Sequence, residues 1–416
     1  KNSITITGGK AKYVYGGYMN AATNNSAATG NHVVYEGGES TNVVGSWRNG
    51  TGALTGNYAA LRGGTAGAVY GAIHEGTAGE VKGNYAEVTG GKATNVYGVS
   101  VNDAAHSGDV TENYVKYTNT ADNETEWLIG AYSKGLGALR SNSVTITGGK
   151  AKYVYGGYMS VATHNSAATG NHVTYQGGES TNVVGAYSNG TGALDKNGVT
   201  FHSGKADSLY GAQHAGTTGA VTDNEVTIAG GETQSIYGGC ITNAAHSGDA
   251  TGNKVTIAGG KITGHVYSGY TTGTGNTTNN TVNLGDGTKD MADGTDLSSA
   301  VLHGGNGTDI TGNTLNVKTK NARVKKVDQF DTYVFHLNPT VSDGSTMLSL
   351  AEGGLGTTAP KWSNIKAELD GAVWERNRLT VGITLAEGSA DNSITIADYD
   401  HQKYLGAHGD FEYVMD

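Results

Sequence analysis

A short motif that recurs along the chain limits what this sequence can fold into. In most copies it reads Asn-x-apolar-x-apolar-x-Gly-Gly, and copies begin 26 to 29 residues apart. Such self-similarity is typical of a solenoid, in which each repeat stacks on the next. The motif begins at Asn2, Asn31, Asn57, Asn84, Asn113, Asn142, Asn171, Asn197, Asn224 and Asn253. Two further copies begin at Asn280 and Asn313 at looser spacing.

The spacing itself has a longer period. The five intervals that follow Asn2 recur after Asn142, which is 140 residues later. Residues 2–57 and 142–197 differ at 11 of 56 positions, so this duplication is recent. We therefore expect a repeat domain over residues 1–317. It would contain five-coil superrepeats at 2–141 and 142–280, followed by irregular coils.

Within each repeat, the pattern predicts three strands. Ile4 and Ile6 alternate with polar residues, and this period of two indicates a half-buried strand. Segments such as 14–16 and 52–54 predict a second and a shorter third strand. Three strands and three corners in one repeat predict an all-β, right-handed parallel β-helix of ten to twelve coils. At about 4.8 Å per coil, the rod would be on the order of 50 Å long.

The corners contain residues suited to tight turns. Asparagine bonds to nearby backbone and tolerates a left-handed φ, and stacked asparagines can pair along a structural ladder. The Gly-Gly pairs supply conformations that other residues avoid. The fifth coil differs, because Asn119-Thr120 replaces Gly-Gly and acidic residues such as Asp122 and Glu126 follow. We expect a surface bulge there, which could form a contact site.

A row of tyrosines is the most ambiguous feature. It comprises Tyr15, Tyr70, Tyr97, Tyr155, Tyr210, Tyr237 and Tyr267. The residue before each tyrosine is aliphatic, so we expect the aliphatic residue inside and the tyrosine outside. The favoured interpretation is a stacked ladder that stabilises the sheet. The alternative is an aromatic strip that binds a glycan or another partner.

Composition narrows the class of protein. The 416 residues include 68 Gly, 2 Pro and 1 Cys, and the net charge is −10. This charge argues against nucleic acid or anionic lipid as a partner. The basic stretch at 318–326 is interpreted as a solvated strand face. No apolar run reaches the roughly 18 residues of a membrane span. The chain starts inside a repeat, so we expect it to be a piece of a longer protein.

The search for chemistry finds no catalytic residue, metal site or cofactor site. His106 with Asp109 could act as a base with its orienting acid, but the pair recurs as His246 with Asp249, as duplicated loop sequence would. Residues 304–309 resemble a calcium-binding nonapeptide, yet the match is degenerate. A carbohydrate-active β-helix enzyme, either a lyase or a glycoside hydrolase, remains an alternative without paired carboxylates to support it.

Another alternative is an ice-binding face on an outward threonine column. The column would contain Thr145, Thr174, Thr200, Thr227 and Thr256. Val34, Ala60, Glu87 and Lys116 interrupt it in the first half, and threonine is favoured in strands for other reasons. We rank this interpretation last.

After about residue 317 the pattern changes. Both prolines and the segments 329–337, 343–350 and 379–383 predict a small β domain over 318–416 that caps the solenoid. The Gly-rich Val-Tyr-Gly-Gly-Tyr repeats, followed by Phe-x-x-Tyr-x-Phe-x-Leu-x-Pro, resemble the passenger regions of bacterial autotransporter adhesins. The resemblance implies a β-helical passenger, on the cell surface or released. The signal peptide and the membrane barrel of that family are missing here, which leaves the tether open.

Together these observations predict a non-enzymatic structural or adhesive protein outside the bacterial cell. Its partners would be further copies of itself, or a glycan or protein on a host or bacterial surface, with membrane attachment only through an anchor outside this sequence. Residues 393–396 echo residues 3–6, which suggests that the C-terminal region of one copy caps the first coil of the next and builds a filament.

Overall fold

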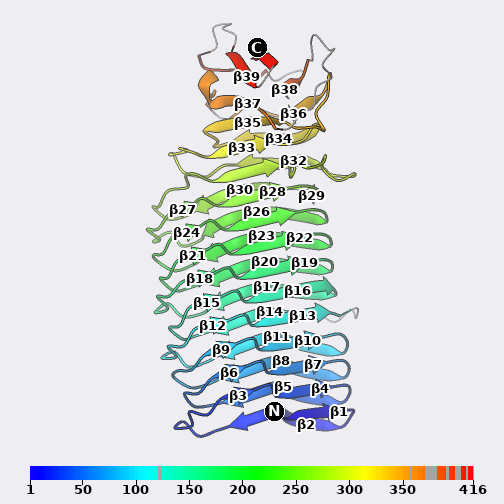
Figure 1. Cartoon of the computed structure of the whole chain (residues 1–416), viewed down its shortest axis with the longest axis vertical. Coiled ribbons are helices and arrows are strands. Elements are labelled where there is room, and N and C mark those ends of the chain that lie inside the picture. The colour runs from blue at the N-terminus through cyan, green and yellow to red at the C-terminus, as the bar shows by residue number, and fades with distance from the viewer. Residues whose placement is uncertain are drawn as a thin grey trace.

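The chain winds into a parallel β-helix in a computed structural model, which describes residues 1–119, 124–356, 358–370, 382–389, 393–398, 404–408 and 411–415. Its coils stack along one axis, with the N-terminal coil at one end and the C-terminal strands at the other (Figure 1). Two long sheets and one shorter sheet run the length of the stack, and neighbouring strands such as β1 and β4 pair in parallel. The predicted β-solenoid is therefore confirmed.

The first sheet has 14 strands: β1 (Ser3–Ile6), β4 (His32–Tyr35), β7 (Tyr58–Leu61), β10 (Tyr85–Val88), β13 (Tyr114–Thr118), β16 (Ser143–Gly148), β19 (His172–Tyr175), β22 (Gly198–Phe201), β25 (Glu225–Ile228), β28 (Lys254–Ile257), β31 (Thr281–Leu284), β33 (Thr314–Val317), β35 (Thr332–Leu337) and β37 (Ile365–Leu369). The second has 15: β2 (Lys10–Met19), β5 (Glu39–Arg48), β8 (Thr65–His74), β11 (Lys92–Val101), β14 (Glu124–Ser133), β17 (Lys150–Met159), β20 (Glu179–Ser188), β23 (Lys205–His214), β26 (Glu232–Ile241), β29 (Lys261–Ile262), β30 (His265–Thr271), β32 (Leu297–His303), β34 (Ala322–Asp328), β36 (Thr346–Leu350) and β38 (Thr384–Glu387). The third has nine short strands: β3 (Ala28–Thr29), β6 (Leu54–Thr55), β9 (Val81–Lys82), β12 (Val110–Thr111), β15 (Leu139–Arg140), β18 (Ala168–Thr169), β21 (Leu194–Asp195), β24 (Val221–Thr222) and β27 (Ala250–Thr251). The remaining described elements are the antiparallel pair β39 (Tyr404–His408) and β40 (Phe411–Met415), and the short 3-10 helix η1 (Trp362–Asn364).

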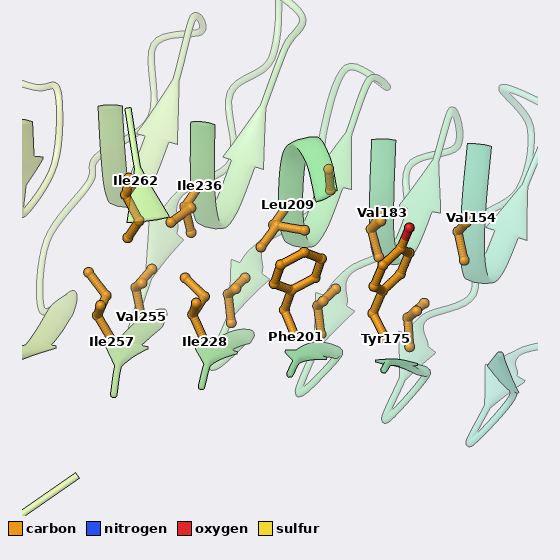
Figure 2. Packing of buried hydrophobic residues seen from close by; sticks show 14 of the residues in the cluster. Val154, Tyr175, Val183, Phe201, Leu209, Ile228, Ile236, Val255, Ile257 and Ile262 are labelled. Atoms are coloured by element: carbon orange, nitrogen blue, oxygen red, sulfur yellow. The ribbon is translucent and has the colours of Figure 1, made fainter. Parts of the chain in front are cut away.

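The interior of the rod has two apolar lobes. In the first lobe, side chains of the first sheet face those of the second, as Phe201 faces Leu209 in Figure 2. The second lobe lies between the second and third sheets, where Val99, Leu139 and Ile241 are fully buried. Each lobe is continuous along the stack, so a coil buries its apolar residues only against its neighbours.

A column of glycines separates the two lobes. At Gly156, an added Cβ would lie 2.5 Å from the carbonyl oxygen of Gly185 and 2.8 Å from the backbone nitrogen of His172. Both obstructing atoms belong to backbone, which cannot move aside as a flexible side chain can. The first sheet therefore begins in direct contact with the backbone of the second sheet, and only glycine fits this position.

The corners depend on left-handed residues, but the ladder asparagines are not among them. The second glycine of each pair has positive φ, as at Gly38 with 93°. At the other corner, the residue before each asparagine adopts positive φ, even at Lys196 and Asp223, each with 53°. The expectation that asparagine itself would take this conformation is wrong. Its amide must remain in the ladder, so the preceding residue makes the turn.

The fifth coil departs from the regular corner, as its sequence suggested. The pairing of β13 with β16 shifts register between Tyr117 and Thr118, and the side chain of Asn119 donates to the carbonyl of Gly91 at 3.0 Å. The centre of the acidic segment, including Asp122, lies outside the described residues. Its proposed role as a contact site stays a prediction.

The two long sheets continue beyond residue 318. β33 pairs with β35 and β34 with β36, both in parallel, so these residues extend the solenoid where the sequence predicted a separate β domain. The third sheet ends at β27, which explains the change of pattern. Within the predicted domain, residues 393–396 form no strand, and 379–381 lie outside the described residues. The antiparallel pair β39–β40 alone departs from the solenoid among the described strands.

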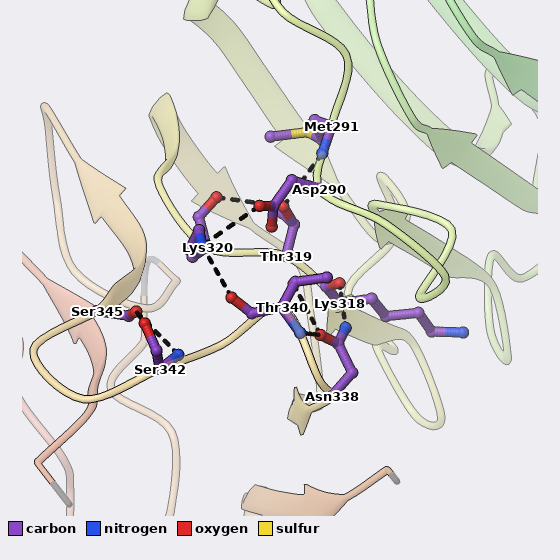
Figure 3. A network of polar contacts seen from close by, with 9 residues as sticks. All are labelled: Asp290, Met291, Lys318, Thr319, Lys320, Asn338, Thr340, Ser342 and Ser345. Atoms are coloured by element: carbon purple, nitrogen blue, oxygen red, sulfur yellow. Dashed lines mark hydrogen bonds and ion pairs between the residues drawn. The ribbon is translucent and has the colours of Figure 1, made fainter. Parts of the chain in front are cut away.

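Polar contacts join coils across this transition. Lys320 lies 3.4 Å from Asp290, and its ammonium group donates to the carbonyl oxygen of Thr340 at 2.9 Å (Figure 3). Asn338 donates to the carbonyl of Lys318 in the same network. Part of the basic stretch therefore pairs with neighbouring coils. Within the described residues, no helix is long and apolar enough to cross a membrane.

Candidate functional site

The repeat asparagines form one ladder of side-chain hydrogen bonds. In a typical step, Asn142 Nδ2 donates to Asn171 Oδ1 at 2.9 Å and to the carbonyl oxygen of Val110 at 2.9 Å. Its backbone N–H donates to the same Asn171 oxygen at 3.0 Å. All ladder asparagines except Asn2 are buried. Because the amides bond to one another and to the third sheet, the ladder connects coils and offers no group to a ligand.

The tyrosine row lies on the outer face of the second sheet, and most of its rings stack on one another. Tyr210 and Tyr237 have ring centroids 4.8 Å apart and an interplanar angle of 4°. Tyr70 and Tyr97 stack at 4.9 Å and 6°. Such contacts cover the π faces, so these rings stabilise the sheet. The favoured interpretation of the row fits this geometry, except around Tyr155.

Around Tyr155 the row widens into an aromatic cluster that the sequence analysis missed. Tyr158 stacks on Tyr187 at 4.7 Å, but it meets Trp127 at 88° and Tyr155 at 83°. The rings therefore meet at mixed angles rather than in one continuous stack. We define the aromatic face as Trp127, Tyr132, Tyr153, Tyr158 and Tyr187, which are all half-buried on strands β14, β17 and β20. The signal was an aromatic residue three positions after the tyrosine row.

The polar edge of this aromatic face is neutral at physiological pH. Burial, followed by the neighbouring Tyr187 and Tyr132, raises the pKa of Tyr158 to about 12. Its phenol thus stays protonated and can both donate and accept hydrogen bonds. Tyr187 already donates to Asn189 Oδ1 at 2.8 Å, and the ammonium group of Lys152 lies 5.1 Å from the ring centroid of Tyr153. Hydrogen-bonding groups therefore border the rings.

The structure does not bring together the histidine and aspartate of the duplicated loop. His106 Nδ1 bonds to the carbonyl of Gly76 at 2.8 Å, whereas Asp109 accepts from the backbone of Ala138 at 3.0 Å and lies 3.5 Å from Arg140. His106 is fully buried, and desolvation lowers its pKa. In the second copy, the same separation holds, because the side chain of His246 accepts from Gly248 and that of Asp249 from Asn276. These residues organise loops.

The calcium-like segment is also occupied with its own contacts. Asp309 accepts from the hydroxyl of Thr311 at 2.6 Å and from its backbone N–H at 3.0 Å. Asn306 bonds to the backbone of Thr271 in the preceding coil. Within the described part of the chain, no group of three His, Cys, Asp or Glu side chains could hold a metal ion.

The threonine column exists in register on the outer face of the first sheet. Thr145, Thr174, Thr200, Thr227 and Thr256 lie on consecutive strands. The column gives way to Lys116 on one side and to Asn283 on the other. Five coils of threonine form a short regular surface, and its proposed contact with ice stays untested.

Known proteins offer no closer guide. Neither a protein-family profile, nor a curated protein, nor a solved structure matches this chain. The resemblance to autotransporter passengers therefore rests on the repeat pattern and on the β-solenoid that the pattern predicted.

Proposed function

We propose that the chain is an extracellular, non-catalytic rod from a bacterial surface protein, which adheres to a surface glycan through the aromatic face. The supporting observation is the gathering of Trp127, Tyr132, Tyr153, Tyr158 and Tyr187 on three consecutive strands of one sheet. Aromatic side chains are enriched where proteins bind partners, because they contribute a large contact area with a polar tip. A solenoid presents such a cluster on a stiff support.

A glycan suits this surface chemically. Ring edges and faces can contact the C–H groups of sugars, while the phenol of Tyr158 and the amide of Asn189 can bond to hydroxyls. The acidic rod carries a net charge of −10, so a neutral or cationic glycan fits better than a polyanionic one. The enzyme alternative gains no support from the histidines, because they are buried and their neighbouring aspartates bond elsewhere.

A pair of variants tests this proposal. The double substitution Tyr158→Ser and Tyr187→Ser should lower binding of the full chain to a glycan array and to bacterial or host cells by at least about tenfold. Tyr114→Ser is the matched control, because this tyrosine is 37% exposed on the outer face of the other sheet. Equal binding by all three proteins would refute an adhesive role for the aromatic face. Binding only to cells from which glycans were removed would instead indicate a protein partner.

End-to-end assembly belongs to the same proposal. Strands at the ends of the two long sheets carry backbone groups that can pair with another copy. Sedimentation at increasing concentration should then reveal a series of growing species, and a monomer at every concentration would exclude assembly. Protease treatment of intact cells that display the native protein tests its location outside the cell.

A further inference from the structure

One position on the outer face of the first sheet lacks a side chain and leaves a cavity. The first residues of consecutive strands form a column that runs through His172, Gly198, Glu225 and Lys254. Beside Gly198 the surface opens into a cavity of about 280 Å³. We call this cavity the Gly198 notch. Its polar lining comprises His172, Lys196, Thr200, Asp223, Glu225 and Thr227.

The first superrepeat shows what size of group the notch accommodates. Tyr58 stands 140 residues before Gly198, next to His32, which is the counterpart of His172. The ring of Tyr58 occupies the corresponding space and is only 8% exposed. It packs against His32 with centroids 5.7 Å apart. Replacement of this tyrosine by glycine in the second superrepeat therefore leaves room for one six-membered ring.

Polar groups around the notch are held in place but retain bonding capacity. His172 Nε2 bonds to the hydroxyl of Thr200 at 3.0 Å, while Nδ1 lies 3.1 Å from the point where a Cβ on Gly198 would be. Lys254 and Thr227 both contact Glu225 Oε1, at 3.1 and 3.2 Å, which leaves the second carboxylate oxygen available. Burial lowers the pKa of His172, so the imidazole is neutral and can accept a hydrogen bond.

Asp223 adds a second carboxylate at the rim. It occupies the left-handed corner before the ladder asparagine and is exposed to solvent. Within the described residues, no hydrogen bond or ion pair engages its carboxylate. Lys196, the corresponding corner residue of the preceding coil, lies 3.6 Å from Asp195 and brings an ammonium group to the same rim. The notch thus combines carboxylate, imidazole, hydroxyl and ammonium groups around a ring-sized space.

We propose that the Gly198 notch binds one pyranose residue of a glycan. The carboxylates of Asp223 and Glu225 accept hydrogen bonds from its hydroxyls, His172 Nδ1 faces the ring, and Lys196 donates to a ring or hydroxyl oxygen. The volume lies near the lower end of ligand pockets, which suits a single sugar residue. An aromatic side chain of the same size would leave these polar groups unpaired, and such mismatches are strongly disfavoured. This site is independent of the aromatic face, which lies on the other sheet.

The experiment uses the full chain and monosaccharide probes. Methyl glycosides of glucose, galactose, mannose and N-acetylglucosamine, together with glucosamine, are titrated while the side-chain NMR signals of His172 are followed. At least one sugar should shift these signals with a dissociation constant on the order of millimolar, as few contacts support a single residue. N-acetyltyrosinamide serves as the aromatic probe. Binding of that probe alone, or no shift with any sugar up to about 50 mM, would overturn the proposal.

Variants separate this site from general effects on the fold. Gly198→Tyr restores the residue of the first superrepeat and should reduce sugar affinity by more than about tenfold. Gly198 does not have positive φ, so its backbone can accept a side chain. Asp223→Asn, at the exposed rim, should weaken binding several-fold without filling the notch. Thr281→Tyr places the same ring in the same column two coils away and should leave affinity unchanged. Retained binding by both Gly198→Tyr and Asp223→Asn would contradict the assignment.

Discussion

Mild acid should destabilise this rod through histidines enclosed in its loops and second lobe. Five histidines have fully buried side chains: His74, His106, His164, His214 and His246. The ring of His214 accepts a hydrogen bond from Gly216 at 3.1 Å and bonds to the carbonyl of Gly192 at 3.0 Å, which suits the neutral form. Desolvation lowers the pKa of His74 to about 3 and that of His214 to about 4.

The sign and size of the effect follow from proton linkage. An unfolded histidine has a pKa of about 6.5 and binds a proton below that pH, whereas His74 and His214 remain neutral in the fold. Acid therefore favours the unfolded state, and stability is lost as pH falls from about 6.5 towards the lowered folded values. At pH 5, about 1.5 pH units below the unfolded pKa, each histidine costs about 2 kcal/mol. The two together should lower the free energy of unfolding by about 4 kcal/mol relative to pH 7.5.

Urea unfolding at pH 7.5 and pH 5 measures this difference. Serine is the matched replacement, because Ser133 and Ser188 occupy the same column and each accepts a hydrogen bond from the glycine two residues later at 3.0 Å. His74→Ser with His214→Ser should be less stable at pH 7.5 but lose about 4 kcal/mol less on acidification. The exposed His202→Ser should retain the acid loss of the wild type. An equal acid loss in the double variant would refute the reasoning.

Three further predictions concern the scaffold. Asn142→Ala should cost roughly 3 kcal/mol or more, because it leaves buried ladder partners unpaired, and this loss is measurable as a lower urea midpoint. Gly156→Ala should lower the melting temperature sharply, since its Cβ would collide with backbone on two sides, whereas Gly8→Ala, with open space around it, should leave the melt unchanged. The thiol of Cys240 should react with a maleimide only after denaturation, because complete burial raises its pKa.

Much of the scaffold followed from the repeat because its signals are local. Alternation such as that of Ile4 and Ile6 fixes which side chains point inward, and the recurring asparagine fixes the register between coils. An in-register stack then places identical residues above one another, so an Asn column implies an amide ladder. The candidate site was harder to foresee. The tyrosine row was visible in the sequence, but its stacking, and the wider cluster around Tyr155, depend on side-chain packing between coils.

The sequence by itself determined the period, the parallel stacking and the all-β class, because each depends on a pattern within one repeat. Tertiary structure alone decided features that depend on distances between coils and sheets. It divided the interior at glycines such as Gly156, placed positive φ before the ladder asparagines, and continued the sheets past residue 318. It also separated His106 from Asp109 and opened a notch at Gly198. The physical reason is that a local pattern fixes which face a residue occupies, whereas contacts between faces depend on how the whole coil closes.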